Sequence, residues 1–184
     1  VELNVLETEP FEIQIQKTHG TYQGGHELVD VTVNNGSEEM WGFDILIAYD
    51  ASALSFQTAV EGSVYADCGW EYFTYRYGAN GNCGNACPSG LLRVVGLAET
   101  NNGPNHPSCF TATGKCLFTL DFLVTDDRTF ECMYVPIRFF WTDCGDNTVS
   151  YHELADVANP YSQTLGISRW VFDYEGYELT GEGT

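Results

Sequence analysis

The sequence predicts an all-β sandwich, and three observations carry that prediction. Short segments alternate apolar and polar residues, most clearly at Val29, Val31 and Val33 and again at Phe43, Ile45 and Ile47; this is the period of a strand with one buried face. Turn-forming residues separate about nine to eleven such segments at roughly ten-residue spacing, which is typical of sandwiches. No segment has helical periodicity beyond one or two turns.

The elements can be predicted in order along the chain. Strands are expected over residues 1–6, 11–16, 29–33, 43–47, 70–77, 91–98, 116–124, 134–141 and 166–172, and a further strand is expected to start at Leu54. A tight turn is expected at Asn34–Ser37, whose residues tolerate positive φ. Pro136 belongs at an edge or a bulge, because it cannot donate to a ladder. Loops or turns are expected over 62–69, 78–90, 99–108 and 142–150, and two of these are long enough to be candidates for interaction.

The composition excludes some classes of partner. The 184 residues include 7 Lys+Arg and 26 Asp+Glu, for a formal net charge of −19. Seven scattered cations cannot form the basic patch that nucleic acid requires, and anionic membrane surfaces are disfavoured for the same reason. Such a surface suits solubility, divalent cations or cationic partners. With 43% hydrophobic and 14% aromatic residues, the chain can bury a core.

The cysteines indicate the compartment. None of them forms a zinc pattern, so we expect disulfides in an oxidising environment, extracellular or at the cell surface. The chain has seven cysteines. Because this number is odd, at least one thiol stays outside any disulfide within the chain. Which cysteines pair with each other is left open. The chain begins at Val1 and has no long apolar run, so we expect that any leader has been removed and that nothing spans a bilayer. The candidates are Cys68, Cys83, Cys87, Cys109, Cys116, Cys132 and Cys144.

The N-terminal segment is predicted to stand apart from the body. We expect residues 1–10 to form an extension, hinged at Glu7–Pro10, and residues 11–184 to form one sandwich domain. The extension is either an edge strand of its own domain or a donor strand that enters a groove of another copy. The second interpretation resembles donor-strand-exchange pilus subunits in mechanism. Its interface residues would be Val1, Leu3, Val5 and Leu6.

The stretch His26–Val60 carries a family resemblance. A Val-rich strand and a turn are followed by a longer strand that ends in Tyr49-Asp50, and then by Leu54. This arrangement resembles the cohesin-like, immunoglobulin-related β-sandwiches of bacterial extracellular proteins. The resemblance implies an immunoglobulin-like or jelly-roll sandwich and an extracellular location. It also implies a possible function, binding a partner protein on a sheet face, as cohesins bind dockerins.

The candidate chemistry is sparse. No GxSxG, HExxH or glycine-rich phosphate loop is present, so we predict that the protein is not an enzyme. Asp143, Asp146 and Asn147 place side-chain oxygens around a glycine turn, as calcium prefers; the alternative is an ordinary Asx turn. No other cofactor is expected.

Three functions therefore compete. We predict a structural subunit of a pilus-like extracellular filament, a homopolymer joined by its N-terminal strand. The first alternative is a cohesin-like protein-binding adhesion module. The second is a carbohydrate-binding module that uses Trp70 and Tyr72, which we expect on one face of an aromatic strand.

Overall fold

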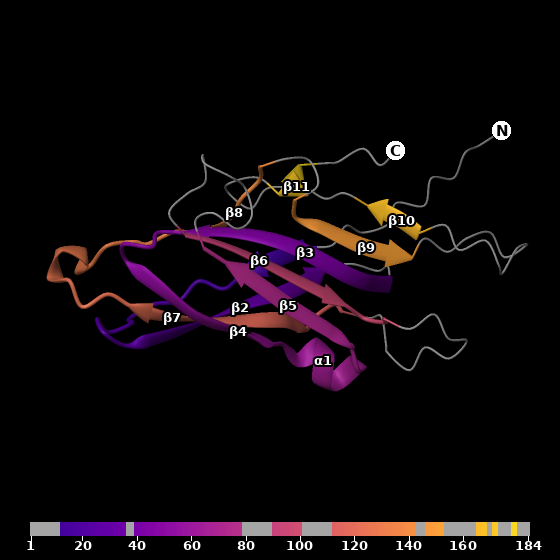
Figure 1. Cartoon of the computed structure of the whole chain (residues 1–184), viewed down its shortest axis with the longest axis horizontal. Helices are drawn as coiled ribbons and strands as arrows, with labels where there is room; N and C mark the ends of the chain where they lie inside the picture. The colour runs from indigo at the N-terminus through magenta and orange to yellow at the C-terminus, as the bar shows by residue number, and fades with distance from the viewer. Residues whose placement is uncertain are drawn as a thin grey trace, which may run out of the picture.

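The protein folds as two antiparallel β-sheets packed face to face, which confirms the predicted all-β sandwich (Figure 1). The computed structural model describes residues 12–35, 39–78, 90–100, 112–142, 146–152, 165–168, 171–172 and 178–179. Sheet A has the strand order β1 (Glu12–Ile15), β2 (His26–Asn35), β7 (Cys116–Val124), β4 (Leu54–Glu61). Sheet B has the order β10 (Leu165–Ser168), β9 (Thr148–His152), β3 (Glu39–Tyr49), β6 (Gly90–Leu97), β5 (Tyr72–Tyr77), and β8 (Ile137–Phe139) also pairs with β3.

The smaller elements lie outside these two sheets. A six-residue helix, α1 (Ser63–Cys68), follows β4, and a 3₁₀ turn, η1 (Arg128–Phe130), follows β7. The short strands β11 (Val171–Phe172) and β12 (Glu178–Leu179) pair with each other. Among the described residues no helix is long and apolar enough to cross a membrane.

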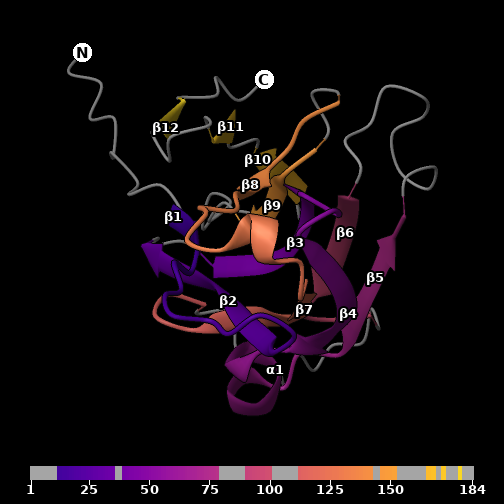
Figure 2. The ribbon, with the colours of Figure 1, turned by 90° about the vertical axis from the view of Figure 1, so that its left-hand side faces the viewer.

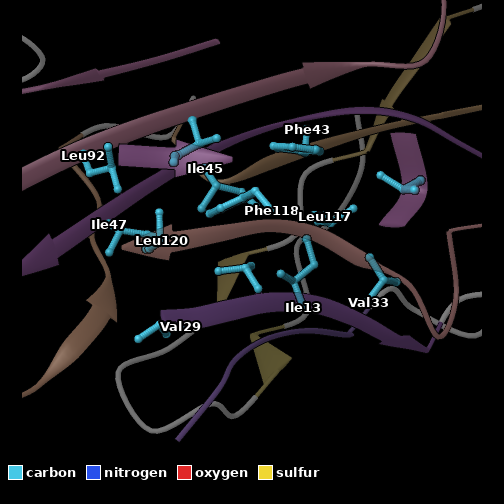
Figure 3. Packing of buried hydrophobic residues seen from close by; sticks show 14 of the residues in the cluster. Ile13, Val29, Val33, Phe43, Ile45, Ile47, Leu92, Leu117, Phe118 and Leu120 are labelled. Atoms are coloured by element: carbon cyan, nitrogen blue, oxygen red, sulfur yellow. The ribbon is translucent and has the colours of Figure 1, made fainter. Parts of the chain in front are cut away.

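The core lies between the sheets and is built from the predicted alternation. Val29, Val31 and Val33 point from β2 toward the side chains of Phe43, Ile45 and Ile47 on β3, and all six are buried. The central strand β7 adds Phe118, Leu120 and Phe122, each fully buried. Figure 3 shows Phe43, Ile45 and Ile47 from one layer and Val29, Val33, Phe118 and Leu120 from the other, with their side chains in the space between. Since one residue in two faces inward on each strand, the outer faces of both sheets remain for other purposes.

The connection from β2 to β3 differs from a hairpin. The two strands are consecutive in the chain, but β2 pairs with β1 and β7, whereas β3 pairs with β6, β8 and β9. The chain therefore passes from one sheet to the other here. Both strands have a strongly apolar face, and in opposite layers each face covers the other.

Three local predictions need correction. The expected loop 62–69 contains α1, which is too short to show helical periodicity; Gly62 precedes it and Gly69, at φ 66°, ends it in the left-handed conformation. The expected strand 134–141 is only three residues long, Ile137–Phe139, and starts immediately after Pro136 because proline cannot donate to a ladder. The expected turn 142–150 already contains the start of β9 at Thr148.

The predicted boundary between residues 1–10 and 11–184 stays a prediction. Residues 1–11 lie outside the described part of the chain, and so does the predicted donor strand with Val1, Leu3, Val5 and Leu6.

Candidate partner-binding face

The two outer faces of the sandwich differ in character. On sheet A the outward side chains bond to each other across strands: Thr119 Oγ1 donates to Asp30 Oδ1 at 2.6 Å, and His26 Nδ1 lies 2.8 Å from Asp121 Oδ1. The same face also carries the exposed apolar side chains of Leu28 and Val60, so it mixes polar and apolar groups. On sheet B the outer face of β3, β6 and β5 carries large apolar side chains instead. Figure 2 shows β5 and β6 side by side at one edge of the molecule.

The centre of this apolar surface is a cross-strand pair, Tyr72 on β5 and Leu97 on β6. The two residues are partners in register, and their exposed fractions are 42% and 38%. Gly42 lies opposite Leu97 on β3, and a Cβ there would come within 2.8 Å of Leu97 Cδ2. The Leu97 side chain therefore occupies the space left by the absent side chain. Thr74 and Val95 form the next cross-strand pair and are half-buried. We call these four residues, Tyr72, Thr74, Val95 and Leu97, the open patch.

A charged network borders the open patch. Arg93 of β6 points outward, and its Nη1 donates to Asp44 Oδ2 of β3 at 3.0 Å. Its Nη2 donates to Asp146, whose side chain is almost completely buried. The other oxygen of Asp146 accepts hydrogen bonds from the N–H and the hydroxyl of Thr142, at 2.8 and 2.6 Å. One guanidinium thus joins β6, β3 and the segment before β9, and it compensates two partly desolvated carboxylates.

Asp44 keeps one acceptor unused. Its Oδ1 atom is buried and has no hydrogen-bond partner in the structure. Burial raises the pKa of the Asp44 carboxyl, and Arg93 acts in the opposite direction. A carboxylate oxygen that is buried without a hydrogen-bond partner has a desolvation cost, which adds to the raised pKa of this group.

The opposite end of the same face is closed. Leu46, Ala48 and Leu91 are buried on the outer side of sheet B, and Phe140 packs against them. Asn147 fixes this arrangement, because its Oδ1 accepts from Leu46 N–H at 2.9 Å and its Nδ2 donates to the Phe140 carbonyl at 2.8 Å. Among the described side chains of β3, β5, β6 and β8, this end of the outer face is therefore covered, whereas Tyr72 and Leu97 at the other end are exposed.

Two of the three predicted calcium ligands, Asp146 and Asn147, lie at this surface and form hydrogen bonds to protein groups. Asp146 bonds to Arg93 and Thr142, and Asn147 bonds to main-chain groups of Leu46 and Phe140. Asp143 lies outside the described residues. Within the described part of the chain no group of three or more His, Cys, Asp or Glu side chains is arranged to hold a metal. The calcium site stays a prediction.

The cysteines divide into three groups. Cys68 is disulfide-bonded, to a partner outside the described residues. Cys116 and Cys132 are free thiols, which confirms that at least one thiol is left over and removes these two from the disulfide candidates. Cys116 lies within β7, where its Sγ contacts the Phe118 carbonyl at 3.3 Å, and Cys132 is in an exposed turn. The remaining candidates also lie outside the described residues: Cys83, Cys87, Cys109 and Cys144.

The aromatic strand predicted over 70–77 begins only at Tyr72, as β5, so Trp70 is not part of it. Trp70 precedes β5 and is only 5% exposed; it packs against Phe43 and Tyr65. It is therefore not an exposed ring, and the predicted sugar platform of Trp70 with Tyr72 is wrong. Sequence reasoning also missed the Asp44–Arg93 pair. The signal for it was Asp44 itself, a single carboxylate inside the apolar strand Phe43–Ile47, which needs a polar partner on the outer side of that strand.

Comparison with known proteins identifies the fold. One similar structure is the sixth cohesin of scaffoldin B from Acetivibrio cellulolyticus, solved in complex with a mutant Cel5 dockerin; it is 17% identical, with 78% of this chain and 86% of that chain covered and a TM-score of 0.52. Another is the seventh ScaB type I cohesin from Pseudobacteroides cellulosolvens, at 14% identity, 79% and 81% coverage and a TM-score of 0.52. No family model and no curated protein matches the chain. The chain has a cohesin-like β-sandwich.

Proposed function

We propose that this chain is an extracellular, non-catalytic protein-binding module that takes its partner on the open patch of sheet B. The observation that carries the proposal is the exposed cross-strand pair Tyr72–Leu97 on the outer face of sheet B. A fold neighbour supports it, since that cohesin was solved with a dockerin bound. A dockerin-like partner is the class we propose for this chain.

The chemistry of the open patch fits a protein partner. Tyrosine is among the residues that contribute most to binding when they are buried at the centre of an interface, and Leu97 provides an adjoining apolar contact. A partner that covers Tyr72 and Leu97 would gain the free energy of burying their apolar surface.

The test is titration calorimetry with purified dockerins, beginning with the Cel5 dockerin bound by the similar cohesin. We expect a one-to-one complex, weakened at least about tenfold by Tyr72→Ala or Leu97→Ala, as for central interface residues. Two matched controls lie away from sheet B: Tyr22 is 87% exposed, and Leu28 is 58% exposed on sheet A. Tyr22→Ala and Leu28→Ala should leave affinity unchanged. Equal losses in all four variants would contradict the proposed face.

The filament hypothesis stays a prediction, because its joint, Val1–Leu6, lies outside the described residues. The fold comparison supports the protein-binding alternative better. Electron microscopy separates the two: filaments formed by the full chain and lost in a chain without residues 1–9 would support strand exchange. Compact particles from both chains would exclude it.

A further inference from the structure

The edges of the two sheets differ in their protection against pairing with another chain. On sheet A, β1 has four residues and an irregular register at Glu12, and β4 has a register shift between Phe56 and Thr58. On sheet B, β8 and β10 are three and four residues long. Short length and bulges are common ways to prevent strand addition. β5 has neither, because its six residues pair with β6 in unbroken register, and among the described strands β6 is its one partner.

The open side of β5 presents main-chain groups of three residues. Directly after β5, the Gly78 N–H donates to the Leu91 carbonyl of β6 at 3.1 Å. Successive residues of a strand direct their N–H and C=O groups to opposite sides, so Gly78 and every second residue before it face β6. The N–H and C=O groups of Phe73, Tyr75 and Tyr77 therefore point away from β6, at the outer edge of sheet B (Figure 2).

The aromatic rings on the inner side of this edge are incompletely covered. Phe73 and Tyr75 are half-buried where they pack against the core. Tyr77 is 58% exposed, although its ring centroid lies 5.0 Å from that of Phe56. An added strand would cover these rings with its own inward side chains, so it would gain apolar burial as well as main-chain hydrogen bonds.

Carboxylates surround this edge but are absent from it. Residues 72–98 contain no Asp or Glu. Arg76 is the one charged residue of β5, and it interacts with other groups of its own chain. Glu71, just before β5, accepts hydrogen bonds from the Thr100 N–H and hydroxyl at 2.9 and 2.6 Å. A second copy can thus approach β5 without opposing two carboxylates there, although more distant carboxylates still repel. The carboxylates on and beside sheet B and on β4 include Glu39, Asp44, Glu61, Glu71, Glu99 and Asp146.

We propose that two copies of this chain pair antiparallel along β5, about a two-fold axis at Tyr75. In this register Tyr75 lies opposite itself, and Phe73 lies opposite Tyr77 of the second copy. Each of these hydrogen-bonded pairs exchanges two N–H···O bonds, and aromatic pairs across strands are favourable. On the outer side Arg76 meets Thr74, so like charges are not directly opposed. This self-complementarity favours a second copy as the occupant.

The proposal is independent of the open patch. The dimer uses the edge of β5, whereas Tyr72 and Leu97 are exposed on the outer face of sheet B. Both copies would keep that surface, side by side on one continuous sheet. A partner with two binding segments would then gain from a raised effective concentration.

Sedimentation velocity of the full chain over a range of concentrations tests the dimer. All samples carry Cys132→Ser, because Cys132 is an exposed free thiol that could link copies by itself. We expect a reversible dimer that tightens when NaCl is raised from about 50 mM to about 500 mM, since the formal charge of −19 on each copy is then screened. A monomer at all protein concentrations up to about 0.5 mM in the higher salt would overturn the proposal.

Two variants at one position isolate the main-chain bonds. Tyr77→Ala removes the ring, and Tyr77→Pro removes both the ring and the N–H that faces the edge. We expect Tyr77→Pro to dimerise at least about tenfold more weakly than Tyr77→Ala, because two hydrogen bonds are lost per dimer. Thermal melting shows whether both are folded. Leu97→Ala, on the outer face, is the control and should leave dimerisation unchanged; a loss in Leu97→Ala as large as in Tyr77→Pro would place the contact on the face and overturn the proposal.

Disulfide trapping tests the register without relying on these variants. Thr74→Cys and Arg76→Cys are prepared as separate chains, each with Cys132→Ser. In the proposed register positions 74 and 76 of different copies form a non-hydrogen-bonded pair with Cα atoms about 4.5 Å apart, which a disulfide can bridge. Mixing the two chains under mild oxidation should give cross-linked dimers, whereas either chain alone should not. Cross-linking in neither case, or equally in the mixture and in the separate chains, would refute the pairing.

Discussion

Asp50 shows how one carboxylate organises the turn between β3 and β4. Its Oδ1 accepts hydrogen bonds from the Ser52 hydroxyl at 2.5 Å and from the Ser52 N–H at 2.9 Å. These bonds hold the pKa of Asp50 below its ordinary value, and the hydrogen bond from the Ser52 hydroxyl is the largest cause. Because the pKa is lowered in the folded state, the resulting stabilisation is present above the unfolded pKa and is lost as pH falls through the folded one.

The first prediction follows from this turn. Ser52→Ala should raise the pKa of Asp50 toward its ordinary value, because the largest cause of the shift is removed. Carboxyl-carbon NMR titration measures it directly. Ser55→Ala, three residues further along the chain, provides the control and should leave the Asp50 titration unchanged. An unaltered Asp50 pKa in Ser52→Ala would show that the main-chain bonds suffice.

Tyr65 links α1 to the strand that carries the open patch. Its hydroxyl donates to the Tyr72 carbonyl at 3.0 Å, and burial raises the pKa of Tyr65. Tyr65→Phe keeps the ring but leaves that carbonyl without this donor, so the free energy of unfolding should fall by about 1 kcal/mol. Urea denaturation measures the loss. Tyr134, which is highly exposed, is the control, and Tyr134→Phe should be neutral; equal stability of the two variants would contradict the prediction.

At the residue level the sequence identified positions better than roles. Asp146 and Asn147 were singled out for their side-chain oxygens, and the structure uses them in an ion pair with Arg93 and in bonds to the main chain. Two of these partners, Arg93 and Leu46, lie 53 and 101 residues away in the chain. Local patterns cannot show such contacts, because they depend on which strands become neighbours across the sheet.

Gly62 is the residue that seats α1 against sheet A. A Cβ at this position would lie 2.2 Å from the Cys116 carbonyl oxygen and 2.5 Å from its carbon. Both are main-chain atoms of β7, which no change of rotamer can move. Gly62→Ala must therefore displace either α1 or β7, and we expect a loss of at least about 3 kcal/mol, at the upper end of overpacking effects. Chemical denaturation measures it.

Gly69 at the other end of α1 is the matched control. Its φ is +66°, but a Cβ there would meet no atom within 4 Å. Gly69→Ala therefore has only the cost of a left-handed backbone, about 1–2 kcal/mol. A smaller loss for Gly62→Ala than for Gly69→Ala would contradict the packing of α1 on β7.

At the level of elements the period-two pattern was the reliable signal. It predicted β7 with its bounds, Cys116–Val124, because that strand is central and one face is wholly buried. It could not predict that β2 and β3 belong to different sheets, since a strand's alternation is the same whichever neighbour it pairs with. The helix α1 was missed because six residues are too few to show a period, and the strand predicted over 134–141 was too long, since β8 covers only Ile137–Phe139.

The whole molecule has a high negative charge. The formal net charge is −19, and the ion pairs among the described residues include those of Arg93 with Asp44 and Asp146 and of Lys115 with Asp67. Folding brings the remaining carboxylates closer together than they are in the unfolded chain, so self-repulsion destabilises the compact state. Exposed pairs such as Lys115–Asp67 contribute little against it.

The free energy of unfolding should therefore rise with salt. Raising NaCl from about 10 mM to about 500 mM shortens the Debye length from about 30 Å to about 4 Å, which screens repulsion across the sandwich while contacts at 3 Å, such as Arg93–Asp44, keep most of their strength. Urea is the denaturant of choice, because guanidinium chloride is itself a salt. Asp67→Asn removes one exposed carboxylate and its pair, and it should leave the salt dependence nearly unchanged. A midpoint that falls with NaCl would show that attractive pairs, rather than net repulsion, dominate the electrostatics of this fold.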